Sequence, residues 1–190
     1  MQGMGPVKDF LPADCLASEY NHEEDWKLNP SYPILIRPLE DEEATACEDI
    51  LRSLPNWFGI EEAIVHYCRD IEAMDTYIAE VEGSIVGFLT LNQHNPYTAE
   101  IHIIAVREEH HRCGVGHSLV NHVEQSLRSR SVEYLEVKTL GPSKPSVQYD
   151  QTRDFYMAVG FRPIEETNLW GKANPCLIMI KHLSCGPDSS

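Results

Sequence analysis

The stretch His110–Val120, HHRCGVGHSLV, places two glycines between a basic cluster and an apolar pattern of helical spacing. It follows the run Ala99–Val106, AEIHIIAV, whose branched apolar residues favour a strand. From Gly116 to Ser131, apolar residues again recur along one helical stripe. The sequence therefore predicts a strand, then a turn with two bare backbone positions, then a helix.

Gly114 and Gly116 are suited to a turn that binds phosphate. The first turn of a helix has N–H groups without intrahelical partners and carries partial positive charge. Glycine lets a phosphate approach that backbone closely, and Arg112 adds a charged donor. The turn is not a Walker A loop, because no Gly-Lys-Ser/Thr follows, and it lacks the third glycine of a dinucleotide fingerprint. On these residues alone, a tight turn that binds nothing is an equal alternative.

The rest of the chain alternates between strand and helix patterns. We expect a helix capped by Asp41 and a hairpin turn at Glu82-Gly83. The expected strands are Ile34–Leu39, two runs within Thr76–His94, Ala99–Val106, Tyr134–Leu140, Phe161–Trp170 and Asn174–Leu183. The expected helices run to Leu54 and over Ile60–Ala73, Gly116–Ser131 and Ser146–Gly160. This order predicts an α/β (α+β) domain whose mixed sheet carries helices on its faces.

Composition sets the remaining boundaries. Residues 33–184 are predicted to form the domain, residues 1–32 an N-terminal arm and residues 185–190 a tail.

A net charge of −15 argues against nucleic-acid binding. The six cysteines are scattered without a CxxC pair, and no apolar run is long enough to cross a membrane. We therefore expect a cytoplasmic protein with reduced thiols and no membrane partner.

Residues 34–183 resemble the GCN5-related N-acetyltransferase (GNAT) family. That family's acyl-CoA loop reads Q/R-x-x-G-x-G/A, and this chain has both glycines with His111 at the first position. A later helix of the family carries N-x-x-A-x-x-F-Y-x-x-x-G-F. The chain matches it at Phe155-Tyr156 and Gly160-Phe161, with Tyr149 in place of Asn and Thr152 in place of Ala.

The resemblance implies the GNAT fold, a mostly antiparallel central sheet of about six or seven strands with helices on both faces. It also implies acetyl-CoA, whose acyl-pantetheine would insert beside the strand that precedes the glycine turn, with the Ile104 N–H facing the thioester carbonyl. The implied cofactor-binding residues are Ile104, Ala105, Val106, His111, Arg112, Cys113, Gly114, Val115, Gly116, His117, Ser118, Tyr149, Thr152 and Phe155.

For catalysis the resemblance implies Tyr156 as the acid that protonates the departing sulfur; the alternative is a core aromatic residue. Glu100 is the candidate general base, and His102, which shares its strand parity, is the alternative. The alternative for Glu100 is a solvated charge at the end of a strand, and a lone histidine on a strand, such as His102, is more often structural. Cys113 could carry an acyl group, but direct transfer needs no such step. No metal site is predicted, because His117 and His122 lie five residues apart and align poorly on a helix.

The function that the resemblance implies is direct transfer of an acetyl group from acetyl-CoA to a primary amine of a small molecule or a protein. Trp57, Phe58 and Glu61 are candidate acceptor contacts, although a loop anchor and ordinary helix-start carboxylates explain them as well. The alternatives are a non-catalytic acyl-CoA sensor on the same fold and a nucleotide-binding regulator. A homodimer is compatible with the sequence, and no pattern specifies one.

Overall fold

The computed structural model describes residues 33–183, so the predicted arm and tail lie outside the described residues. The predicted order of helices and strands is confirmed, with one added 3-10 turn, η3 (Glu108–His110). The elements are β1 (Leu35–Pro38), α1 (Ala44–Arg52), α2 (Glu61–Ala73), β2 (Asp75–Val81), β3 (Ser84–Asn95), β4 (Thr98–Val106), α3 (Val115–Ser129), β5 (Tyr134–Leu140), α4 (Val147–Ala158), β6 (Arg162–Thr167) and β7 (Cys176–His182).

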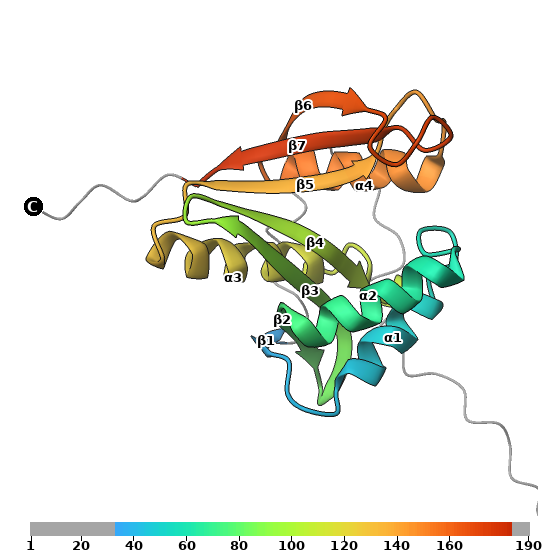
Figure 1. The fold of residues 1–190 in the computed structure, drawn as a ribbon. Helices are drawn as coiled ribbons and strands as arrows, with labels where there is room; N and C mark the ends of the chain where they lie inside the picture. Colours follow the sequence, from blue (N-terminus) through green and yellow to red (C-terminus); the bar gives the residue numbers. More distant parts are fainter. Residues whose placement is uncertain (1–32, 184–190) are drawn as a thin grey trace, which may run out of the picture.

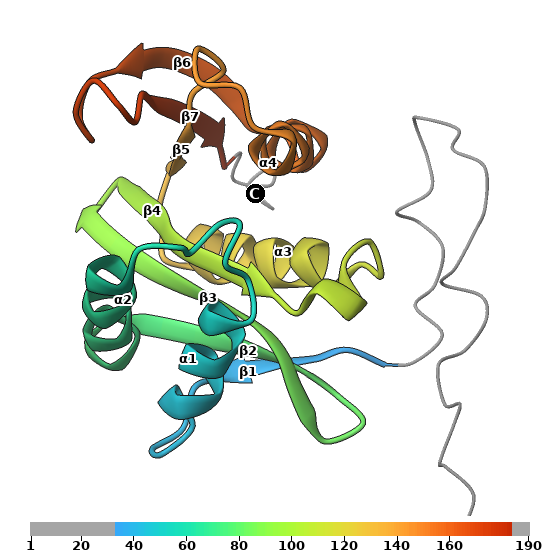
Figure 2. The same cartoon turned by 90° about the vertical axis from the view of Figure 1, so that its right-hand side faces the viewer.

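The strands form one seven-stranded sheet in the order β1-β2-β3-β4-β5-β7-β6 (Figure 1). All neighbours pair antiparallel except β4 and β5, which are parallel. Helices α1 and α2 lie on one side of strands β2–β4 and α3 on the other (Figure 2). Two buried clusters result, one beneath α1 and α2 and one shared by α3 and α4. The predicted mixed, mostly antiparallel sheet with helices on both faces is confirmed.

Strands β4 and β5 pair only where they begin. Their register runs from Thr98–Tyr134 to Ile101–Val137 and then stops. Figure 1 shows the two strands side by side at one end and apart at the other, with the N-terminal end of α3 and helix α4 near the open end. The sheet therefore contains a wedge-shaped gap, which we call the β4–β5 gap.

A bulge in β4 changes which face its side chains occupy. Thr90 pairs with Ile103 and Leu91 with Ile101, so His102 is the extra residue. Ile101 packs in the cluster under α3, whereas Ile103 packs in the cluster under α1 and α2. Two residues at a strand spacing of two would normally share a face. The bulge therefore turns Ile103 to the face of α1 and α2, the face that His102 already occupies by alternation with Ile101.

Local turn chemistry agrees with the sequence in two places and differs in one. Glu82 and Gly83 both have positive φ, as the predicted hairpin turn requires, and Gly160 has φ +100° just after α4. The predicted cap by Asp41 is wrong: Glu43 occupies the N-cap of α1 without a side-chain capping bond. The Glu43 carboxylate instead accepts two hydrogen bonds from Arg37 of β1, at 2.8 and 2.7 Å.

Two further predictions, on the cysteine thiols and on membrane-spanning helices, concern the described residues. Cys47, Cys68 and Cys176 are free thiols. Among helices of the described part of the chain, none combines the length and apolar character that a membrane crossing requires.

Candidate active site

The glycine turn closes the open end of the gap on the α3 side. Gly114 is the N-cap of α3 at φ +83°, and no side chain caps the helix there. The helix ladder begins only with Ser118 N–H donating to the Gly114 carbonyl at 2.9 Å. A Cβ on Gly114 would meet no atom within 4 Å, whereas one on Gly116 would lie 3.3 Å from the Phe155 ring. Gly114 thus leaves open space before the helix, and Gly116 allows α4 to pack closely.

The free edge of β4 faces the same gap. Arg107 N–H donates to the Val86 carbonyl of β3 at 2.8 Å. Because backbone groups alternate in direction along a strand, the N–H groups of Ile104 and Val106 point away from β3 and toward the gap. The gap therefore presents backbone donors that a strand-like ligand could use.

Two buried polar atoms in the described residues lack partners, and both belong to segments that flank the gap. They are Nδ1 of His110, in the η3 turn after β4, and Oγ1 of Thr139, on the part of β5 that does not pair with β4. Buried polar atoms without partners are uncommon in folded proteins and often mark a ligand or water position. Both atoms therefore leave hydrogen-bonding capacity in the segments beside the gap.

Trp57, in the loop between α1 and α2, bridges the two sides of the gap. Its indole N–H donates to Thr152 Oγ1 of α4 at 3.1 Å, and its carbonyl accepts from the Tyr149 hydroxyl at 3.0 Å. On the other side, its ring meets the His111 ring edge-on at a centroid distance of 5.7 Å. We call this loop and its three contacts the Trp57 strap.

His111 binds within the protein. Its Nε2 donates to the Val106 carbonyl at 2.7 Å, which fixes the glycine turn against the end of β4. His111, Tyr149 and Thr152 are the three positions at which the chain departs from the family motifs, and all three contact Trp57. The three departures therefore share one partner, Trp57.

Helix α2 and strand β4 bring a second group of polar side chains together. His102 Nε2 lies 2.7 Å from Asp70 Oδ2, and its ring meets Tyr67 at 6.0 Å. Phe58 contacts Tyr67 in turn, at 5.9 Å. The sequence analysis missed Asp70 and Tyr67. Their spacing of three on one helix was the available signal, since such residues lie on one face.

Glu100, the other candidate base, is tied into an ionic network. Its side chain is 9% exposed, and its Oε2 lies 3.0 Å from Lys138 Nζ and 2.9 Å from His94 Nε2. Lys138 also contacts Glu136 at 2.6 Å. His94, Glu100 and Glu136 are grouped closely enough to suggest a cation, but the Lys138 ammonium already lies between the two carboxylates.

Tyr156 is buried among aromatic neighbours on α4 and after it. Its ring lies 5.4 Å from Phe155 and 5.6 Å from Phe161. Burial first, and the nearby Tyr149 second, raise the pKa of the Tyr156 phenol well above its ordinary value. Burial likewise raises the pKa of Tyr149 and of Tyr67. All three phenols keep their protons at neutral pH.

A comparison of this sequence with known protein families adds independent evidence to the geometry of the gap, the helix N-terminus and helix α4. Residues 35–161 match the model of the acetyltransferase (GNAT) family. The chain belongs to this family. No curated protein matches the chain significantly.

Solved structures show the same fold as this GNAT chain. An acetyltransferase assigned to the family from Desulfovibrio desulfuricans has 16% identity and a TM-score of 0.70, covering 80% of this chain and 100% of its own. The ribosomal-protein-S18-alanine N-acetyltransferase of Escherichia coli has 17% identity and a TM-score of 0.64, covering 83% and 99%. An aminoglycoside 6'-N-acetyltransferase complexed with coenzyme A has 20% identity and a TM-score of 0.63, covering 81% and 99%.

The other predicted site residues of the GNAT chain form two groups: residues around the glycine turn, and Glu61, which lies away from it. Arg112 is exposed with φ +59°, and Cys113, Val115, His117 and Ser118 surround the first turn of α3. Burial lowers the pKa of His117, which favours its neutral form. Glu61 lies at the exposed start of α2, where Arg52 of α1 donates to both its oxygens at 2.8 and 2.9 Å. These two hydrogen bonds link α1 to α2, and they occupy the Glu61 carboxylate that the sequence suggested as a contact for the acceptor.

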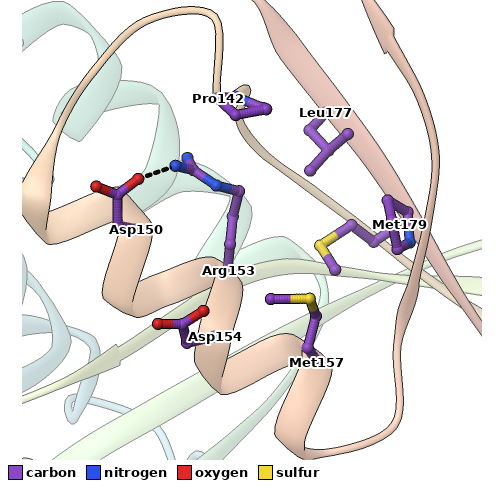
Figure 3. Close-up of a pocket in the computed structure, with 8 residues that line it drawn as sticks. Pro142, Asp150, Arg153, Asp154, Met157, Leu177 and Met179 are labelled. Atoms are coloured by element: carbon purple, nitrogen blue, oxygen red, sulfur yellow. Dashed lines mark hydrogen bonds and ion pairs between the residues drawn. The ribbon is translucent and has the colours of Figure 1, made fainter.

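A separate cavity of about 400 Å³ lies between α4 and β7 (Figure 3). Leu177, Met179 and Met157 give it apolar walls, and Arg153 is paired with Asp150 at its rim. Arg153 also donates to the Leu140 carbonyl at 2.6 Å, so its charge is engaged in holding α4 on β5. None of the predicted site residues lines this cavity.

The strap gives a testable prediction. The Thr152 hydroxyl donates to the Gln148 carbonyl at 3.1 Å and accepts from Trp57, so Thr152→Val leaves the indole N–H unpaired. We expect Thr152→Val to lower the free energy of unfolding by about 1 kcal/mol, measured by urea denaturation. In a Trp57→Phe background, where the bond is already absent, the same change should have little effect. Equal losses in the two backgrounds would show that the strap bond contributes nothing.

Proposed function

We propose that the chain is an acetyl-CoA-dependent N-acetyltransferase that transfers an acetyl group directly to a primary amine. The observation that carries the proposal is the β4–β5 gap, which joins free backbone donors of β4 to a bare helix N-terminus. Membership of the acetyltransferase family supports the same reaction class. The structure of a similar enzyme in complex with coenzyme A supports the cosubstrate.

The chain would hold acetyl-CoA through its backbone more than through charged side chains. The N–H groups at the start of α3 would bind the diphosphate, because they lack intrahelical partners and lie at the positive end of the helix dipole. Gly114 leaves space for that approach, and Arg112 adds a positive charge at the turn. Ile104 and Val106 would pair with the pantetheine as a neighbouring strand does.

The chemical step needs a donor for the carbonyl oxygen, an acid for the sulfur and a base for the amine. The Ile104 N–H would donate to the thioester carbonyl, where negative charge develops. Tyr156 would give its proton to the departing sulfur, and its raised pKa keeps that proton in place until then. Glu100 and His102 are the candidate bases; both lie on β4, Glu100 in the part that pairs with β5 and His102 just past it.

The acceptor is an amine of a small molecule or of a protein. Similar structures include one enzyme named for a ribosomal protein and one named for aminoglycosides, so the fold alone leaves both classes open. The net charge of −15 favours a cationic acceptor, because acidic surfaces raise the local concentration of cations.

The proposal is tested by release of free CoA thiol from acetyl-CoA across a panel of diamines, aminoglycosides and peptides with free N-termini. We expect thiol release that depends on at least one amine, and an acetylated product of that amine by mass spectrometry. Binding of CoA without turnover of any amine would favour the non-catalytic sensor. Binding of ATP or NAD in competition with CoA would favour the nucleotide-binding regulator.

A further inference from the structure

We propose that Asp70 is a positioning residue that makes His102 the general base of this enzyme. The inference rests on the proposed function and adds the identity of the base to it. It begins with β4, where His102 is the extra residue of the bulge and its ring, on the face opposite Ile101, lies toward α2. The ring is then held from α2 by a carboxylate.

The Asp70 contact sets the tautomer of His102. A carboxylate oxygen only accepts, so the 2.7 Å contact with Asp70 Oδ2 requires a proton on His102 Nε2. A neutral imidazole with its proton on Nε2 has a lone pair on Nδ1. Nδ1 is therefore the atom that can take a proton from an amine.

Partial burial and one aromatic contact hold the pair in place. The side chains of His102 and Asp70 are 23% and 33% exposed, so both have access to solvent or substrate. Tyr67, one turn before Asp70 on α2, meets the imidazole ring at a centroid distance of 6.0 Å and an interplanar angle of 75°. Asp70 and Tyr67 together hold the ring, and the tautomer leaves the lone pair on Nδ1.

The competing base is already occupied. Glu100 is 9% exposed and accepts from the ammonium of Lys138, which it shares with Glu136. A carboxylate in such an ion pair would have to give up its partner to bind a proton. His102 has no cationic partner among its described contacts, and its one ionic neighbour is the carboxylate of Asp70. The geometry therefore favours His102 over Glu100.

The acetyl transfer from CoA to the amine accounts for every proton and bond. His102 Nδ1 takes one proton from the ammonium form of the acceptor, and the neutral nitrogen forms a bond to the thioester carbonyl carbon. The bond from that carbon to sulfur breaks, and the sulfur receives the Tyr156 proton. The second amine proton leaves as the amide forms and restores the phenol, directly or through water. The products are the acetylated amine, free CoA thiol and one proton carried by His102, which solvent removes.

Two measurements test the pair. In the wild type, long-range ¹H–¹⁵N correlation spectra of the histidine rings, with His102 assigned by its loss in His102→Gln, should show the Nε2–H tautomer. In Asp70→Asn, whose amide can present either a donor or an acceptor, the His102 signal should report a mixture of tautomers. This readout does not depend on turnover. An Nδ1–H tautomer in the wild type would overturn the proposal.

The kinetic measurement uses the same variants. Asp70→Asn should lower kcat at least about ten-fold with the KM for acetyl-CoA nearly unchanged, since a misdirected base affects proton transfer and leaves cosubstrate binding intact. Asp70→Glu should recover part of the loss, and His102→Gln combined with Asp70→Asn should be no worse than His102→Gln alone. Glu72→Gln, an exposed carboxylate on the same helix, is the matched control and should retain wild-type kcat.

The outcomes separate the two proposals. A wild-type chain that acetylates none of the amines contradicts the proposed function and with it the role of His102 as base, whatever the tautomer. A wild-type chain that acetylates an amine, with Asp70→Asn equally active, contradicts only the pairing of Asp70 with His102.

Discussion

The variant Gly114→Glu is expected to lose measurable CoA binding while remaining folded. In the free protein a Cβ at this position meets no atom within 4 Å, so the new side chain has room. Its direct cost is the left-handed backbone at φ +83°, about 1–3 kcal/mol for a residue other than glycine. With CoA, the carboxylate would lie where the diphosphate should approach the helix. Like charges in contact cost several kcal/mol, so affinity should fall about 100-fold or more by isothermal titration calorimetry.

The chain supplies a matched control for this variant. Gly171 has φ +82° and equally open surroundings, in the connection between β6 and β7. Gly171→Glu therefore introduces the same strain and the same charge away from the glycine turn. We expect it to reduce stability by a similar amount and to bind CoA as the wild type does. Unchanged CoA affinity in Gly114→Glu would remove the diphosphate assignment.

The variant Tyr156→Phe is expected to keep the fold and CoA affinity but to lose about 10²–10⁴-fold in kcat, the usual contribution of a general acid. Its ring is retained, so the packing against Phe155 and Phe161 survives. Only the hydroxyl is lost, and its raised pKa shows a group that stays protonated near neutral pH. The measurement is thiol release at saturating acetyl-CoA, with calorimetry to confirm binding.

Tyr134→Phe provides the comparison for the loss of a phenol elsewhere. Tyr134 begins β5 and is 37% exposed, so its hydroxyl has solvent access. The kcat of the Tyr134→Phe variant should match that of the wild type. If Tyr156→Phe also matched the wild type, Tyr156 would be a core aromatic residue and the sulfur would take its proton from another group.

The fold was largely predictable because several of its turns and helix ends are determined by residues adjacent in sequence. The turn at Glu82-Gly83 and the glycine after α4 each follow from short-range backbone preferences. Asp41 shows the limit of that reasoning. Its type suits a cap, but Arg37 holds Glu43 at the N-cap position through a contact between β1 and α1 that no local pattern encodes.

The site was predictable only where it depends on backbone. The two glycines and the strand before them follow from sequence, whereas the bulge at His102 is set by register with β3. Asp70 reaches His102 from 32 residues earlier, and Trp57 reaches Thr152 across 95 residues. Such pairs exist only once the elements have packed. The departures at His111, Tyr149 and Thr152 were visible as departures, but their shared partner was not.

The most direct test of the account is amide hydrogen exchange with and without CoA. If the ligand pairs with the free edge of β4, the amides of Ile104 and Val106 should become protected, together with those in the first turn of α3. The amide of Arg107, already bonded to Val86, should change little. Protection confined to another part of the chain, such as the cavity between α4 and β7, would contradict the account.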